Sequence, residues 1–133
     1  HGGTRAVFLK RAQLTVSDLA HALPGSLGRF RDLAELTLFA DNLVPHVLRL
    51  DGVLRFEPSL VARIDAEQLI PAGSAEEVEI RACAGDAVEQ MVASLRARSP
   101  SVCARDLDDW LWRRGGEPAY KARPRHRTRC PYY

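Results

Sequence analysis

The chain has 133 residues, of which 46% are hydrophobic and 27% are charged, and its formal net charge is +2. This length allows one buried core, and therefore one domain or part of one. No apolar run is long enough to span a membrane and no signal peptide is present, so we expect no membrane contact. The sequence begins with His1 and its only methionine is Met91, from which we expect a portion of a longer protein.

The residue types that bind metals or form disulfides are few and scattered. Three cysteines, Cys83, Cys103 and Cys130, form no C-x-x-C pair, and the four histidines show no H-E-x-x-H spacing. An odd number of cysteines argues against a disulfide framework and fits a reducing compartment. We therefore predict a cytoplasmic protein without a metal site or a cofactor.

Basic residues concentrate near the C-terminus. Seven Lys or Arg and one Glu lie between Arg113 and Tyr133, whereas the preceding residues carry an acidic excess. Composition alone favours a disordered basic arm over residues 118–133. The tyrosines of this segment favour instead an irregular strap laid back over the domain. We predict a helical domain at 1–117 and this C-terminal strap at 118–133.

The spacing of apolar residues predicts an all-α fold with about five helices. No strand alternation, GxGxxG, P-loop or G-x-S-x-G motif occurs in the sequence. Pro24-Gly25 stops the first helix, whose apolar residues lie on one face, and Pro58 suits the first turn of the third. We place the helices at about 6–23, 33–50, 58–70, 75–98 and 103–114.

The longest predicted helix carries three local signals. Ser74 and Glu77 have the spacing of an N-terminal capping box. Glu77 and Arg81 stand at i, i+4 in the favourable order, and we interpret that pair as structural. Gly85 costs about 1 kcal/mol relative to Ala in a helix. We expect the close approach of a neighbouring element to compensate for it.

The stretch around which the sequence is organised is 36–56, with Asp41 and Pro45 at its centre. We predict that Asp32 and Glu35 cap a helix that runs to Leu50 and bends at Pro45. Since proline lacks an N–H, such a bend would free the carbonyl of Asp41 beside its carboxylate. Asp41 is then either a surface residue near a kink or a group that meets a polar ligand.

Other polar residues allow two readings each. Lys10 is either a solvated cation or a partner for a phosphate or carboxylate. Asp108 and Asp109 share a helix with Trp110 and Trp112. The commoner arrangement is one core tryptophan with a solvated acidic face, and the alternative is an aromatic wall with a carboxylate aimed at a ring N–H.

Five segments in order resemble the C-terminal part of the queuosine salvage family. They are LKRAQLTVSDL (9–19), FADNLVPHVLRLDGVLRF (39–56), LIPAGSAEEVEIRA (69–82), LDDWLW (107–112) and RPRHRTRCPYY (123–133). The resemblance covers nearly the whole chain. It implies a helical, DNA-glycosylase-like fold and hydrolysis of the N-glycosidic bond of queuosine 5′-phosphate, which releases queuine for tRNA modification. It also implies an N-terminal portion, absent here or present as a companion chain.

The resemblance assigns site residues by position. Asp41 is the catalytic carboxylate that stabilises an oxocarbenium-like sugar and orients water. Lys10 either pairs with Asp41 or binds the 5′-phosphate. The predicted substrate-binding residues are Asn42, His46, Asp108, Trp112, His126, Arg127 and Tyr133.

Two positions depart from the family's F-A-D-Y-x-x-P-Q motif, because Asn42 and His46 stand where Tyr and Gln would be. Base recognition is therefore expected to differ in detail. Two other functions compete with the hydrolase. A nucleic-acid-binding module would use the basic strap and lose affinity steeply with salt, although we expect no nucleic-acid partner. A non-catalytic helical interaction domain would tolerate loss of Asp41.

Overall fold

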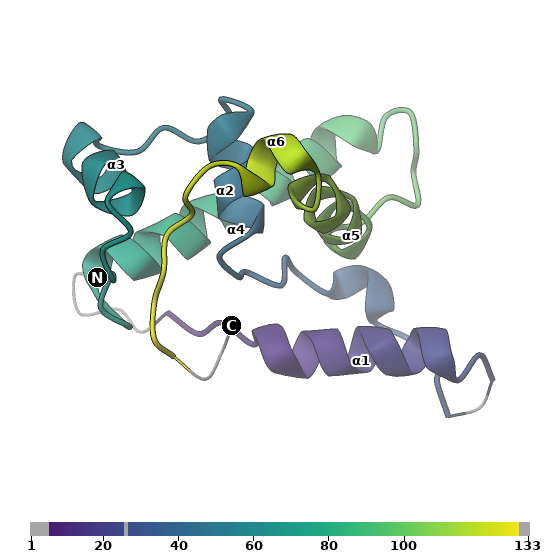
Figure 1. The fold of residues 1–133 in the computed structure, drawn as a ribbon. Helices are drawn as coiled ribbons and strands as arrows, with labels where there is room; N and C mark the ends of the chain where they lie inside the picture. The colour runs from purple at the N-terminus through teal and green to yellow at the C-terminus, as the bar shows by residue number, and fades with distance from the viewer. Residues whose placement is uncertain (1–5, 26, 131–133) are drawn as a thin grey trace.

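The computed structural model describes residues 6–25 and 27–130 (Figure 1). Its described residues form helices and no strand, which confirms the all-α class. Within this part of the chain, none of the helices is both long and apolar enough to cross a lipid bilayer. The α-helices are α1 (Lys10–Ala22), α2 (Val44–Leu50), α3 (Pro58–Asp65), α4 (Ala75–Leu95), α5 (Ala104–Gly115) and α6 (Pro118–Lys121), and Leu33–Glu35 forms a 3₁₀ helix, η1.

The main core lies where α2 meets α4 and α5 (Figure 1). Helix α2 is short but almost wholly buried, with Val47 fully inaccessible. Gly115 is the last residue of α5 and lies close to Leu43, the residue before α2. A Cβ at position 115 would lie 2.7 Å from the Leu43 side chain. The core residues are Leu38, Ala40, Val44, Val47, Leu48, Ala84, Val88, Val92, Ala104, Leu107, Leu111 and Tyr120.

The long helix and the last predicted helix are confirmed as α4 and α5. Ser74 caps α4 by accepting the backbone N–H of Glu77, as predicted. The expectation for Gly85 is wrong, since no atom lies within 4 Å of a Cβ built there. Helix α3 ends at Asp65, earlier than predicted, because Glu67 has a left-handed backbone conformation (φ 55°) that cannot continue the helix to Leu69.

The predicted helix at 33–50 is wrong. Only η1 and α2 are helical in this stretch, and residues 36–41 are not helical. Pro45 lies in the first turn of α2, where a missing N–H breaks no helical hydrogen bond. It therefore makes no kink, and Asp41 precedes the helix instead of lying at a bend. Asp32 makes no side-chain capping bond.

Helix α1 runs along one side of the other helices (Figure 1). Part of its apolar face is open to solvent, since Leu19 is 40% exposed and Leu23, the residue after the helix, is 43% exposed. Its contact with the segment that follows is polar instead: Gln13 Oε1 accepts the backbone N–H of Thr37 at 2.8 Å. The buried residue of α1 is Ser17.

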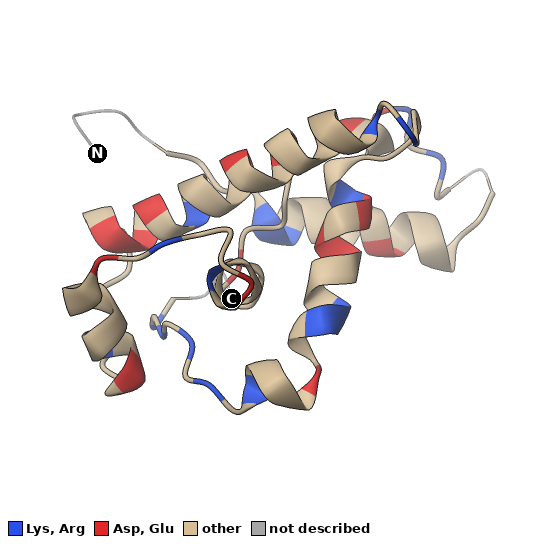
Figure 2. Ribbon diagram, turned by 90° about the horizontal axis from the view of Figure 1, so that it is seen from above, with Lys and Arg blue, Asp and Glu red and all other residues tan. Residues whose placement is uncertain are grey.

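The start of the segment 118–133, predicted to be irregular, forms the short helix α6. Beyond it, the backbone N–H of Ile70 donates to the carbonyl of Arg127 at 2.8 Å, and Arg49 Nη2 donates to the carbonyl of Pro124 at 2.9 Å. Basic residues follow one another along this stretch (Figure 2). The division into a domain and a strap stays a prediction.

Candidate functional site

A cavity of about 560 Å³ lies between α1, α5 and the segment that precedes α2. Four of the nine predicted site residues line it together: Lys10, Asp41, Asp108 and Trp112. Its volume is in the range of small-molecule sites. The other lining residues are Leu14, Ser17, Asp18, His21, Phe39, Arg105, Asp106, Asp109 and Arg113.

Asp41 is held by the start of α2. Its Oδ1 accepts the backbone N–H groups of Leu43 at 2.8 Å and Val44 at 3.0 Å. These bonds satisfy backbone donors of the N-cap and the first residue of α2, which have no partner within the helix, and they fix the carboxylate in one orientation. The residue is buried, and its Oδ2 has no hydrogen-bond partner among the described residues. One oxygen therefore anchors Asp41, and the other is available to a ligand.

Asp108 brings a second buried carboxyl group from α5. Its Oδ1 accepts the backbone N–H of Phe39 at 3.0 Å. Burial raises the pKa of Asp108 to about 7. The Phe39 hydrogen bond and the charge of Lys10 oppose this rise in pKa, and the charges of Asp41 and Asp109 add to it. Near neutral pH, Asp108 therefore exists in both its protonated and its ionised form.

Lys10 begins α1 and is half-buried at the cavity. It makes no ion pair within 4.0 Å with a described carboxylate, Asp41 included. Of the two alternatives for Lys10, the ion pair with Asp41 is therefore not formed within the described residues. The ammonium group is left for a ligand that enters the cavity.

Trp112 is 56% exposed and lines the cavity, while Trp110 is 52% exposed under the guanidinium group of Arg114. The commoner arrangement, with one tryptophan in the core, is therefore wrong. Leu107 and Leu111 fill the core-facing side of α5 instead. Trp112 and Asp108 line the same cavity, but no tryptophan ring N–H donates to a carboxylate within the described residues, so the alternative stays a prediction.

The remaining described candidates lie outside this cavity and hold the C-terminal segment. Asn42 Nδ2 donates to the carbonyl of His126 at 3.4 Å, and His46 Nε2 donates to the carbonyl of Tyr120 at 3.0 Å. Burial lowers the pKa of His46, and it lowers that of His126 to about 4. Arg127 pairs with Glu67 at 2.7 Å.

A second cavity of about 850 Å³ adjoins these residues and is lined by His46 and Arg127 and by other basic residues of 113–127. Trp112 lines both cavities. Tyr133, the ninth candidate, lies outside the described residues.

Sequence reasoning missed much of the cavity wall. On α1 the wall residues Leu14, Ser17, Asp18 and His21 follow Lys10 at helical spacing, a signal hidden by the more obvious apolar stripe. The lining holds five aspartates against three Lys or Arg, so its formal charge is negative. Such a cavity favours positive charge that develops inside it.

No group of three or more His, Cys, Asp or Glu among the described residues has the arrangement of a metal site. The cavity nevertheless combines an anchored carboxylate, a carboxyl group that titrates near neutrality, a cation and an aromatic ring. These are groups that can orient water, exchange a proton and contact a flat ligand.

Comparison with known proteins places the chain in one family. The model of that family, described as queuosine salvage protein, matches residues 1–133. A protein of Sphaerobacter thermophilus is 46% identical over 132 residues, one of Dictyostelium discoideum is 39% identical over 132, and one of Mus musculus is 34% identical over 141. All three are named queuosine 5′-phosphate N-glycosylase/hydrolase.

These matches cover 98% of this chain but only 41% or 42% of each relative's own length. On the strength of the match over all its residues, the chain belongs to the queuosine salvage protein family.

Proposed function

We propose that this chain supplies the carboxylate side of a site that hydrolyses the N-glycosidic bond of queuosine 5′-phosphate. The activity is the one named for the relatives. The observation that carries the proposal is Asp41, which is anchored through Oδ1 and lines the cavity together with Asp108 and Lys10.

In this reaction the bond between C1′ of the ribose and the base nitrogen breaks, and the bonding pair leaves with the base. Positive charge then develops on the sugar, and the ionised carboxylate of Asp41 stabilises it. The oxygen of a water oriented by Asp41 bonds to C1′, and the proton that this water loses passes to Asp41. Protonated Asp108 donates its proton to the leaving base, consistent with its raised pKa.

The remaining lining groups bind the substrate in this proposal. Trp112 stacks on the flat base, and its exposed ring is placed for such contact. Lys10 binds the 5′-phosphate, because it has no ion-pair partner among the described carboxylates. His126 and Arg127 are less suited to that role than Lys10, since the former is buried and the latter is paired with Glu67.

We further propose that another portion of the enzyme completes the site, since the chain spans 41% of the length of its Sphaerobacter relative. The exposed apolar side chains of α1, Leu14 and Leu19, suit contact with such a portion.

The test is release of free queuine from queuosine 5′-phosphate. We would assay the chain alone and a chimera in which this chain replaces the matching portion of the Sphaerobacter thermophilus relative, hereafter the Sphaerobacter chimera. In whichever protein is active, Asp41→Asn should lower kcat by about a hundredfold or more. Asp86→Asn, an exposed change on α4, is the matched control and should leave kcat unchanged.

Three outcomes would contradict the proposal. The first is no queuine release by either protein. The second is unchanged turnover in Asp41→Asn, which is the expectation for a non-catalytic interaction domain. The third is tight binding of RNA or DNA that weakens steeply with salt, without turnover of the free nucleotide, which would favour the nucleic-acid-binding module.

A further inference from the structure

The segment 39–42 is held in place residue by residue, although it forms no regular secondary structure. Phe39 donates its N–H to Asp108 on α5, and Asn42 bonds to the carbonyl of His126. Asp41 bonds to the start of α2. The carbonyl of Ala40 is also buried, and a buried carbonyl outside a helix or sheet needs a donor from elsewhere in the fold.

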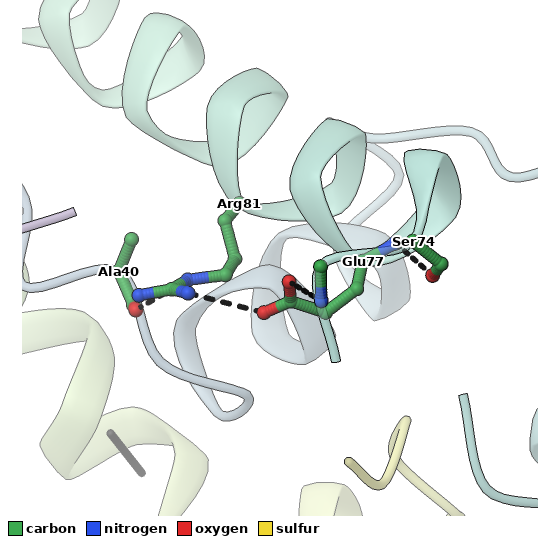
Figure 3. Close-up of polar contacts among 5 residues, drawn as sticks. Ala40, Ser74, Glu77 and Arg81 are labelled. Carbon is green, nitrogen blue, oxygen red and sulfur yellow. Dashed lines mark hydrogen bonds and ion pairs between the residues drawn. The ribbon is translucent and has the colours of Figure 1, made fainter. Parts of the chain in front are cut away.

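That donor is Arg81, which comes from the middle of α4. Its Nε donates to the Ala40 carbonyl at 3.0 Å, and its Nη1 donates to Oε1 of Glu77 at 3.0 Å (Figure 3). Glu77 is itself fixed, because its Oε2 accepts the backbone N–H of Gly73 at 3.2 Å. The Arg81 and Glu77 side chains are only 6% and 4% exposed, so the pair is removed from water.

A buried ion pair is a poor device for stability alone, because the loss of hydration offsets most of the attraction. Its geometry is more informative. The Ala40 carbonyl and the Asp41 nitrogen belong to one planar peptide unit. A donor that fixes the Ala40 oxygen therefore fixes the plane from which the Asp41 side chain departs.

The same guanidinium group also contacts the segment that leads into α1. Its Cζ lies 4.0 Å from the ring centroid of Phe8, which precedes Lys10 by two residues. Stacking of this kind is typical of arginine, whereas the compact ammonium of lysine cannot make it together with two directed hydrogen bonds. One side chain thus contacts the chain immediately before Asp41 and the chain immediately before Lys10.

We infer that Arg81, oriented by Glu77, is a positioning residue that sets the relative placement of Asp41 and Lys10 across the cavity. This inference rests on the proposed function for its catalytic consequence. Arg81 itself does not line the cavity, so it acts through Asp41 and Lys10, which do line it.

The first test uses Arg81→Lys in the Sphaerobacter chimera, which keeps the charge and loses the fork geometry. We expect kcat to fall by about ten- to a hundredfold, because small misplacements of reacting groups have effects of that size. KM should change less than kcat. Arg63→Lys is the matched control, since Arg63 makes the same kind of ion pair with Glu76 at 2.7 Å on the outer side of α4.

The second test separates positioning from general loss of structure. If Arg81 acts through Asp41, Arg81→Lys should change the residual turnover of the Asp41→Asn variant by less than about twofold. An equal loss of kcat in both backgrounds would overturn the inference, as would an effect no larger than that of Arg63→Lys.

The third test needs no turnover, and so it decides the inference even if the proposed function fails. In the chain alone, Arg81→Lys should shift the NMR signals of the Leu43 and Val44 amides, which donate to Asp41. Arg63→Lys should leave both signals in place. Unchanged amide signals in Arg81→Lys would show that Arg81 does not position Asp41.

Discussion

Replacing Asp108 by Asn should change how the stability of the chain depends on pH. In the folded chain the pKa of Asp108 is about 7 because the group is buried, whereas its ordinary value is 3.8. Between these two pH values the folded chain holds a proton that the unfolded chain has released. Raising the pH therefore favours unfolding, at about 1.4 kcal/mol per pH unit, which amounts to about 4 kcal/mol over this interval.

His126 acts in the opposite direction. Burial lowers its pKa from 6.5 to about 4, so between these values the unfolded chain holds the extra proton. Raising the pH then favours folding, by about 3 kcal/mol in total. Because the two effects nearly cancel between about pH 4 and 6.5, the stability of the unchanged chain is a weak test. The difference between the unchanged chain and Asp108→Asn isolates the carboxyl group.

The assay is urea unfolding of both proteins from pH 4 to pH 8.5. Asp108→Asn should match the unchanged chain near pH 4 and exceed its stability by up to about 4 kcal/mol at pH 8. Asp86→Asn, which is exposed, should show no such pH-dependent difference. A constant difference between Asp108→Asn and the unchanged chain across this range would refute the reasoning, and so would a less stable variant at pH 8.

Three further changes test the packing and the surface. Gly115→Ala should destabilise the chain by about 1–3 kcal/mol, because the new Cβ would lie 2.7 Å from Leu43. Gly85→Ala should instead stabilise it by up to about 1 kcal/mol, since nothing lies within 4 Å, and urea unfolding compares the two. The Arg114 hydrogen bond lowers the pKa of Asp51 below its ordinary 3.8, so Asp51→Asn should lower the Tm more at pH 7 than at pH 2.5, because below pH 3.8 the unfolded chain is stabilised by taking up a proton at this carboxylate. A Gly115→Ala chain as stable as Gly85→Ala, or an equal Tm loss from Asp51→Asn at both pH values, would contradict these expectations.

The sequence predicted best the elements whose signals are local. Helix α4 has a capping serine and a long apolar pattern, and α5 ends at a glycine. The prediction for 33–50 was wrong because Leu36 and Phe39, which are half-buried and buried in a non-helical segment, follow helical spacing. Their burial depends on neighbours that are distant in the chain.

For the candidate site too, local motifs identified some residues, whereas features that depend on distant contacts were missed. The motif segments named Asp41 and Lys10, and the structure places both in one cavity. The pKa of Asp108 depends on burial beneath a segment that lies 69 residues away, which local patterns do not encode. Arg81 was interpreted as structural and not as a site residue, because an i, i+4 pair with Glu77 is typical of an exposed helix surface.

The hydrogen bonds of the segment 39–42 have a consequence for the order of folding. They join residues separated by 41, 69 and 84 positions along the chain. Closing such long loops is costly in entropy, so contacts of this kind form late. During synthesis, Asp41 would leave the ribosome well before Arg81, Asp108 and His126 are available to hold its segment. The cavity is therefore expected to take shape only after His126 has left the ribosome, and a nascent chain stalled before Asp108 would carry Asp41 without a formed cavity.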